Sequence, residues 1–186
     1  MRGGGRAAEG GATDREPDKM TSPLAAKFDP ELPLRVAAFR SWRSIKTPVM
    51  VWLWYLNLLY AVGLFHLDRP EAFWAVMSWL AVGPLIAVVI VRQRGLTRLS
   101  GLIHLPWLVF TVWLGMRLFT GSAGAPLSPA QGAFYFYWLH LTFWSTLICV
   151  AFDIVDVIRW LAGERYVLGT PAAAARGASK LARQTA

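Results

Sequence analysis

The sequence predicts an all-α membrane protein with four transmembrane helices in an up-down-up-down antiparallel bundle. Four apolar stretches support this fold, over residues 48–67, 72–91, 101–118 and 133–153. A helix of about 20 apolar residues spans the hydrocarbon core of a bilayer. The connections between the stretches are short, so consecutive helices should lie side by side and run in opposite directions.

The distribution of positive charge predicts the orientation of this bundle. Of the 19 Lys and Arg residues, 17 fall in the N-terminal tail, the second connection or the C-terminal tail, and only Arg69 and Arg117 fall on the other side. Positive residues collect in the cytoplasmic loops of membrane proteins, so both termini should be cytoplasmic. This bias also accounts for the net charge of +8 without a nucleic-acid partner.

The chain of 186 residues has room for one bundle and two tails. We expect a disordered cytoplasmic tail over 1–33, a basic juxtamembrane interfacial helix over 34–46, the bundle over 47–160 and a basic cytoplasmic tail over 161–186. Arg greatly outnumbers Lys, and Ala and Gly are abundant. This composition is typical of GC-rich bacterial genomes and points to a bacterial inner membrane.

The segment over 34–46 has an amphipathic pattern. Leu34, Ala38, Trp42 and Ile45 share one face of the expected helix. Basic side chains should contact anionic headgroups from this helix, as interfacial helices do; they are Arg35, Arg40, Arg43 and Lys46. The alternative is an ordinary positive flank that only sets the topology.

Helix starts are marked by capping residues. Asp68 precedes Glu71 by three residues, with Pro70 between them, and Ser128 with Pro129 repeats the pattern before the fourth stretch. These patterns predict helix N-termini capped by Asp68 and Ser128.

Polar residues inside spans are the first candidates for function because their burial is costly. Asn57 lies near the middle of the first span. It could bond a substrate, but a hydrogen bond between helices is the interpretation we favour.

Two prolines predict kinks, Pro84 in the second span and Pro106 in the third. Each removes one backbone hydrogen bond and should expose the carbonyl four residues earlier. His104 lies beside the second kink and Asp153 at the same end of the fourth span, so the two could form a proton-exchanging or ligand-orienting pair in a cytoplasmic crevice. We favour the alternative that both prolines are ordinary features of membrane helices.

Asp153, Asp156 and Arg159 follow one another at three-residue spacing on one helical stripe. A pair of carboxylates could bind a cation or move a proton, but we favour an ordinary pairing of Asp156 with Arg159. The single cysteine, Cys149, is expected to pack in the fourth span.

The three histidines do not predict a haem site. His104 should lie about 12 Å in depth from His140 at 1.5 Å per helical residue, and His66 and His140 are also offset. We therefore assign no metal ligands and no cofactor.

The sequence contains no HExxH, CxxC, GxSxG or phosphate-loop pattern. No span carries a central charged residue, as a proton-coupled transporter would normally require. We therefore expect a non-catalytic accessory, scaffold or assembly subunit that contacts anionic lipid and either another membrane protein or a second copy. The alternatives are a dimeric small transporter or channel, and a membrane enzyme or redox subunit acting on lipid, quinone or haem.

Overall fold

The computed structural model describes residues 33–121, 124, 127–170, 173 and 175. These residues form helices and connections, with no strand among them. The tail expected to be disordered lies outside the described residues except for Pro33, and so does most of the chain after Thr170.

Four helical stretches of the described chain are long and apolar enough to cross a membrane, which confirms the four expected spans. The first joins α2 (Thr47–Ala61) to the 3-10 turn η2 (Val62–His66), and the second is α3 (Pro70–Gln93). The third consists of η3 (Arg98–His104), α4 (Leu105–Gly115) and η4 (Met116–Thr120). After the short η5 (Pro129–Gln131), the fourth is α5 (Ala133–Leu161).

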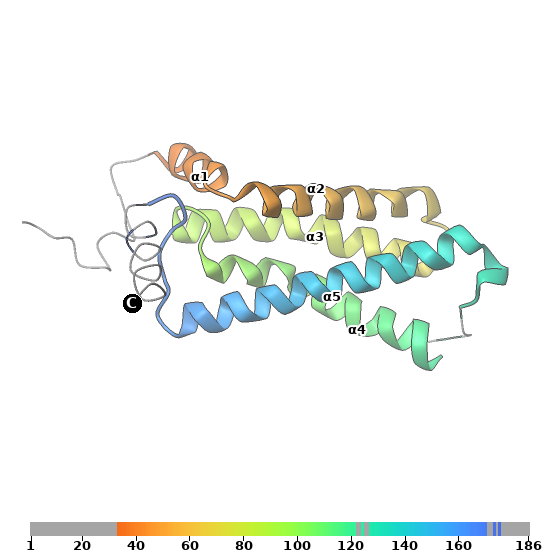
Figure 1. Ribbon diagram of the computed structural model, residues 1–186. Coiled ribbons are helices and arrows are strands. Elements are labelled where there is room, and N and C mark those ends of the chain that lie inside the picture. The colour runs from red at the N-terminus through yellow and green to blue at the C-terminus, as the bar shows by residue number, and fades with distance from the viewer. Residues whose placement is uncertain (1–32, 122–123, 125–126, 171–172, 174, 176–186) are drawn as a thin grey trace, which may run out of the picture.

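A fifth helix, α1 (Leu34–Arg43), precedes the spans. Figure 1 shows the four spans running along one another, with α1 at one end beside the segment that follows α5. We call this the α1 end of the bundle.

The core lies between the four spans and combines aromatic with small side chains. The ring of Tyr60 stacks on Trp107 with centroids 4.9 Å apart, and the Tyr60 hydroxyl is 2.9 Å from the hydroxyl of Thr146. Many large apolar side chains remain exposed along all four spans. An apolar surface of this extent is what a lipid environment covers.

The expected helix caps are wrong. Arg69 rather than Asp68 occupies the N-cap of α3, and it makes no side-chain cap. Ser128 does occupy the N-cap of η5, but its side chain makes no capping hydrogen bond. Glu71 is instead almost fully buried, at 2% exposure. Its carboxylate has stronger partners inside the bundle than the end of its own helix provides, as described below.

The two prolines, which were expected to kink their spans, occupy different positions in their helices. Pro84 lies inside α3, which continues through it. Pro106 lies in the first turn of α4, directly after η3, and the Leu102 carbonyl accepts a hydrogen bond from the Leu105 N–H. The expectation of an exposed Leu102 carbonyl is therefore wrong, because a 3-10 turn supplies an N–H three residues on rather than four.

Three segments pack together at the α1 end: helix α1, the connection between α3 and η3, and the segment that follows α5. The Leu96 N–H donates to Ser41 Oγ at 3.2 Å, and the Leu168 N–H donates to the Leu96 carbonyl at 2.9 Å. A Cβ on Gly95 would lie 2.6 Å from Val167, so glycine is needed where the three segments meet. The first part of the segment over 161–186 is thus folded onto the bundle.

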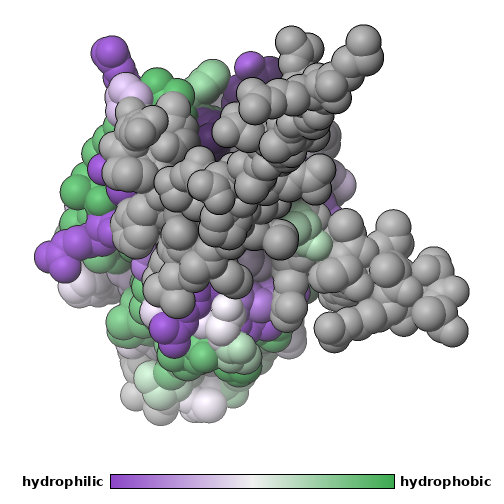
Figure 2. Space-filling view, turned by 90° about the vertical axis from the view of Figure 1, so that its left-hand side faces the viewer, coloured by the Kyte–Doolittle hydropathy of each residue, from purple (hydrophilic) through white to green (hydrophobic). Residues whose placement is uncertain are grey.

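The face of α1 that meets the bundle carries small side chains. Ala37 and Ser41 are buried, whereas Phe39 and Trp42 are exposed. Small side chains allow Leu96 to approach closely, so they take the inner face. Figure 2 looks onto this end and shows hydrophilic side chains beside hydrophobic ones.

Candidate functional site

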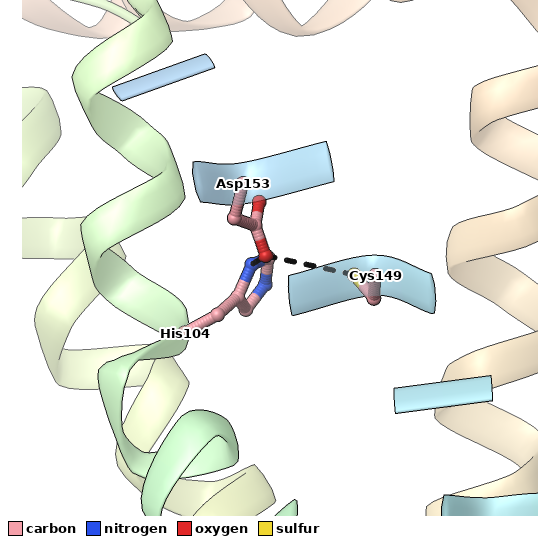
Figure 3. A group of neighbouring side chains, drawn as sticks. All are labelled: His104, Cys149 and Asp153. Carbon is pink, nitrogen blue, oxygen red and sulfur yellow. Dashed lines mark hydrogen bonds and ion pairs between the residues drawn. The ribbon is translucent and has the colours of Figure 1, made fainter. Parts of the chain in front are cut away.

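His104 and Asp153 lie in direct contact between the third and fourth spans. His104 Nδ1 is 2.8 Å from Asp153 Oδ2, and the two side chains are 12% and 19% exposed. Figure 3 shows the imidazole reaching from the end of η3 toward the carboxylate on α5. A carboxylate in this position orients the ring and selects its tautomer.

Local structure around η3 positions the histidine. Thr97 and Ser100 form a reciprocal capping box at the start of η3, in which the Thr97 N–H donates to Ser100 Oγ at 3.2 Å. The His104 ring, at the end of η3, stacks on Trp107 with centroids 4.4 Å apart and planes at 12°. Trp107 also stacks on Tyr60, so the imidazole rests on a ring that the core holds in place.

Gly101 brings η3 close to α5 at the level of Asp153. A Cβ at this position would lie 2.9 Å from the Asp153 carbonyl oxygen and 3.1 Å from its Cα. Only a residue without a side chain permits this approach.

Cys149 is the third member of the cluster. It lies one helical turn before Asp153, and its Sγ is 3.7 Å from Asp153 Oδ2. One ligand-type atom from each of His104, Cys149 and Asp153 falls within 4.8 Å of the other two. These are side-chain types that bind zinc.

Cys149 was interpreted only as a packing residue at the sequence level. Its spacing of four residues from Asp153 places both side chains on one face of α5 and is a signal that could have been used. The position of the His104 ring between them comes from another span and has no signature in the local sequence.

Asp156 belongs to a different network at the α1 end. It forms an ion pair with Arg98, and Arg98 Nε is also 2.8 Å from Glu164 Oε2. Arg159 pairs with Glu164 at 2.9 Å. The expected pairing of Asp156 with Arg159 is therefore wrong: the chain turns back after α5 and brings Glu164 to Arg159.

Glu164 lies beyond the spans, after the end of α5. Burial alone would raise the pKa of its carboxyl. The hydrogen bond from Arg159 and the positive charges of Arg98 and Arg159 outweigh burial, so the pKa of Glu164 is lowered.

Asn57 is not part of either group. Its side-chain oxygen accepts a hydrogen bond from Trp79 Nε1 at 3.0 Å, and its amide donates to the Leu53 carbonyl at 2.7 Å. It therefore links α2 to α3, which is the role we favoured for it.

A buried ionic group at the opposite end was missed. Arg117 Nε donates to Glu71 Oε1 at 2.7 Å, and the Tyr135 hydroxyl donates to Glu71 Oε2 at 3.0 Å. The Arg69 guanidinium lies 4.2 Å from the centre of the Tyr135 ring. At the sequence level Glu71 was assigned to a cap and the two arginines to topology. Glu71 and Arg117 were both expected on the same side of the membrane, and this was the signal in the sequence that could have indicated their pairing.

The other two histidines pack against aromatic rings. The His66 ring lies 5.2 Å from the Tyr135 ring, and the His140 ring lies 4.2 Å from the Phe136 ring. His140 Nδ1 also lies 2.9 Å from the Phe136 carbonyl of its own helix.

Comparisons of this chain with protein-family models, with curated proteins and with solved structures find no match.

Proposed function

We propose that this protein is a non-catalytic accessory, scaffold or assembly subunit of a complex in a bacterial inner membrane. Its four spans run up and down alternately, and the α1 end with both termini faces the cytoplasm. The charge bias of the sequence supports this orientation, because the α1 end carries Arg35, Arg43 and Lys46, all of them exposed.

The polar groups of the spans support a structural role. Glu71 is bound by Arg117 and Tyr135, and Asn57 by Trp79. Two further pairs of hydroxyl groups join α2 to α5, Tyr55 with Ser145 and Tyr60 with Thr146. Polar side chains that bond to one another in this way hold a bundle together. Few polar side chains of the spans are then left to line a path for a polar substrate.

The uncovered half of α3 is the observation that carries the proposal. The mean hydropathy of α3 is the highest of the four spans. All of its buried residues lie between Glu71 and Ser78, so the described residues bury no side chain from Trp79 to Gln93. One side of this half packs on the core through the partly buried Trp79 and Val82. The other side, which carries Leu80, Val88 and Val91, is exposed and can pack against a span of another membrane protein.

The exposed side of α1 supports contact with anionic headgroups. Phe39 and Trp42 are exposed beside Arg35 and Arg43, and the Arg43 guanidinium lies 5.8 Å from the Phe39 ring centre. Aromatic rings and basic groups together suit the headgroup layer. Arg40, in contrast, is only half-exposed.

In-cell crosslinking tests the accessory role. The chromosomally tagged protein is crosslinked, extracted in mild detergent and purified, and its companions are quantified by mass spectrometry. We expect one other membrane protein in stoichiometric amount. Recovery of the chain with no stoichiometric partner contradicts the proposal, and a substrate flux in vesicles that Asp153→Asn abolishes would assign a transporter instead.

A substitution on α3 locates the contact. Apart from its own stretch of helix, no atom of the described residues lies within 4 Å of a Cβ built on Gly83, so Gly83→Leu should leave the fold of the isolated chain unchanged. We expect this variant to lose the partner while it keeps the thermal stability of the wild type. The matched control is Leu147→Ala on α5, whose exposed side chain lies outside the proposed contact and should leave the partner bound.

A further inference from the structure

We propose that His104, Cys149 and Asp153 bind one divalent transition-metal ion of the zinc type. The proposal goes beyond the accessory role and does not depend on it, because it concerns the isolated chain. Among the residues that the structure describes, these three side chains form the group of metal-ligating type whose donor atoms converge.

Two of the three donor separations are close to those of tetrahedral coordination. The third, between the His104 ring nitrogen and Cys149 Sγ, is within 4.8 Å and must be about 3.5 Å when an ion is bound. Zinc bonds of about 2.0–2.3 Å to nitrogen, oxygen and sulfur imply separations of roughly 3.3–3.6 Å between neighbouring ligands. The Cys149 Sγ to Asp153 Oδ2 distance of 3.7 Å is close to this value. The His104 Nδ1 to Asp153 Oδ2 distance of 2.8 Å is a direct hydrogen bond, and it must open by about half an ångström to admit an ion.

The ligands are held by rigid elements rather than by loops. Cys149 and Asp153 project from successive turns of α5, and His104 is fixed by its stack on Trp107. The close approach of η3 at Gly101 holds the two sides of the cluster at their separation. Ligands placed in advance lose little conformational freedom on binding, which favours affinity.

Charge balance also favours a divalent ion. A Cys149 thiolate and an Asp153 carboxylate neutralise two positive charges, and His104 binds as a neutral imidazole. The thiol proton passes to solvent as the metal–ligand bonds form. The imidazole keeps its single proton on the nitrogen that does not bind the ion, so it stays neutral. The resulting site is neutral overall, so it suits the apolar surroundings of a span.

The donor types distinguish among metals. One sulfur and one imidazole nitrogen match zinc and its neighbours, whereas calcium and magnesium take mainly oxygen ligands. Three protein ligands leave a fourth tetrahedral position for water or for a donor from elsewhere. The partial exposure of His104 and Asp153 leaves this position accessible.

Cobalt titration of the purified full-length chain tests the site. The protein in detergent is freed of metal with a chelator and titrated with Co²⁺, followed by Zn²⁺. Because Cys149 is the only cysteine of the chain, a thiolate-to-cobalt charge-transfer band reports on this residue alone. We expect the band to saturate at one ion per chain, with proton release, and to disappear when Zn²⁺ displaces Co²⁺.

Variants separate this site from adventitious binding. Cys149→Ser should lose the band, and His104→Gln and Asp153→Asn should each weaken Co²⁺ binding by about tenfold or more. His140→Gln is the matched control, since His140 lies on the same helix and bonds within it, and it should bind as the wild type does.

Thermal unfolding provides a second readout. An ion that binds only the folded state raises the unfolding temperature as its concentration increases. We expect this zinc-dependent rise in the wild type and in His140→Gln but not in Cys149→Ser. The proposal is overturned if wild-type protein shows no thiolate-to-cobalt band at saturating Co²⁺. It is equally overturned if His104→Gln and Asp153→Asn bind Co²⁺ as tightly as the wild type.

Discussion

Substitution of Gly101 by alanine tests how closely η3 and α5 must approach to form the cluster. The new Cβ would lie 2.9 Å from the Asp153 carbonyl oxygen, and ordinary van der Waals contact begins at 3.4 Å. The helices must therefore separate by about 0.5 Å, which is the difference between these two distances. The obstacle is the backbone of α5, so no rotation of a side chain can relieve the clash.

The magnitude follows from two opposing contributions. Forcing an extra carbon into a packed contact costs about 1–3 kcal/mol. Replacing glycine by alanine in a helical segment returns about 0.5–1 kcal/mol. We expect a net loss of about 1 kcal/mol in the free energy of unfolding, or roughly 2–4 °C in the unfolding temperature of a chain this size.

The assay is thermal unfolding in detergent, followed by the fluorescence of the ten tryptophans. Gly83→Ala is the matched control, because its Cβ would meet nothing within 4 Å. That variant should be as stable as the wild type or slightly more stable. Equal stability of Gly101→Ala and Gly83→Ala would refute the close approach and, with it, our explanation of how His104 reaches Asp153.

Substitutions in three polar contacts provide further tests. Glu71→Gln should lower the free energy of unfolding by about 2–4 kcal/mol, because it removes the carboxylate that Arg117 binds. In a double-mutant cycle, Glu71→Gln should lower this free energy much less when Arg117→Met is already present. Glu164→Gln should lower the unfolding temperature at neutral pH but not under acid conditions. The pKa of the Glu164 carboxyl is lowered by folding, so its contribution is present above the ordinary pKa of glutamate and is lost as the pH falls through the folded value; a wild-type advantage that persists in acid would contradict this. Asn57→Ala should cost about 0.6 kcal/mol, the usual size of a hydrogen bond between membrane helices, and Trp79→Phe should cost a similar amount if the bond between the two side chains is responsible.

The four spans could be predicted from the sequence because their length and apolar character are local properties. The expected stretch over 133–153 lies inside α5, which extends to Leu161.

The candidate site could be predicted only in part. His104 and Asp153 were expected at one depth on different spans, and they are in contact. Cys149 was missed because a cysteine in an apolar helix looks the same whether it packs or faces a ligand. Its contribution depends on the rotation of α5 about its axis, which no local pattern specifies.

The remaining differences arise from tertiary contacts that override local preferences. Glu71 has the spacing of a capping residue but binds Arg117 across the bundle. Arg159 lies three residues from Asp156 but binds Glu164 after the chain reverses. For Glu71 the partner comes from another span, and for Arg159 it comes from the turn after α5, while Asp156 pairs with Arg98 of η3.

The mass of the native particle tests the central claim most directly. The protein is extracted from its own membrane together with the surrounding lipid, and the intact particle is weighed by native mass spectrometry. Our account predicts a particle that contains this chain and a different membrane polypeptide in a fixed ratio. A particle whose protein mass is that of this chain alone, or a whole multiple of it, would contradict the accessory role.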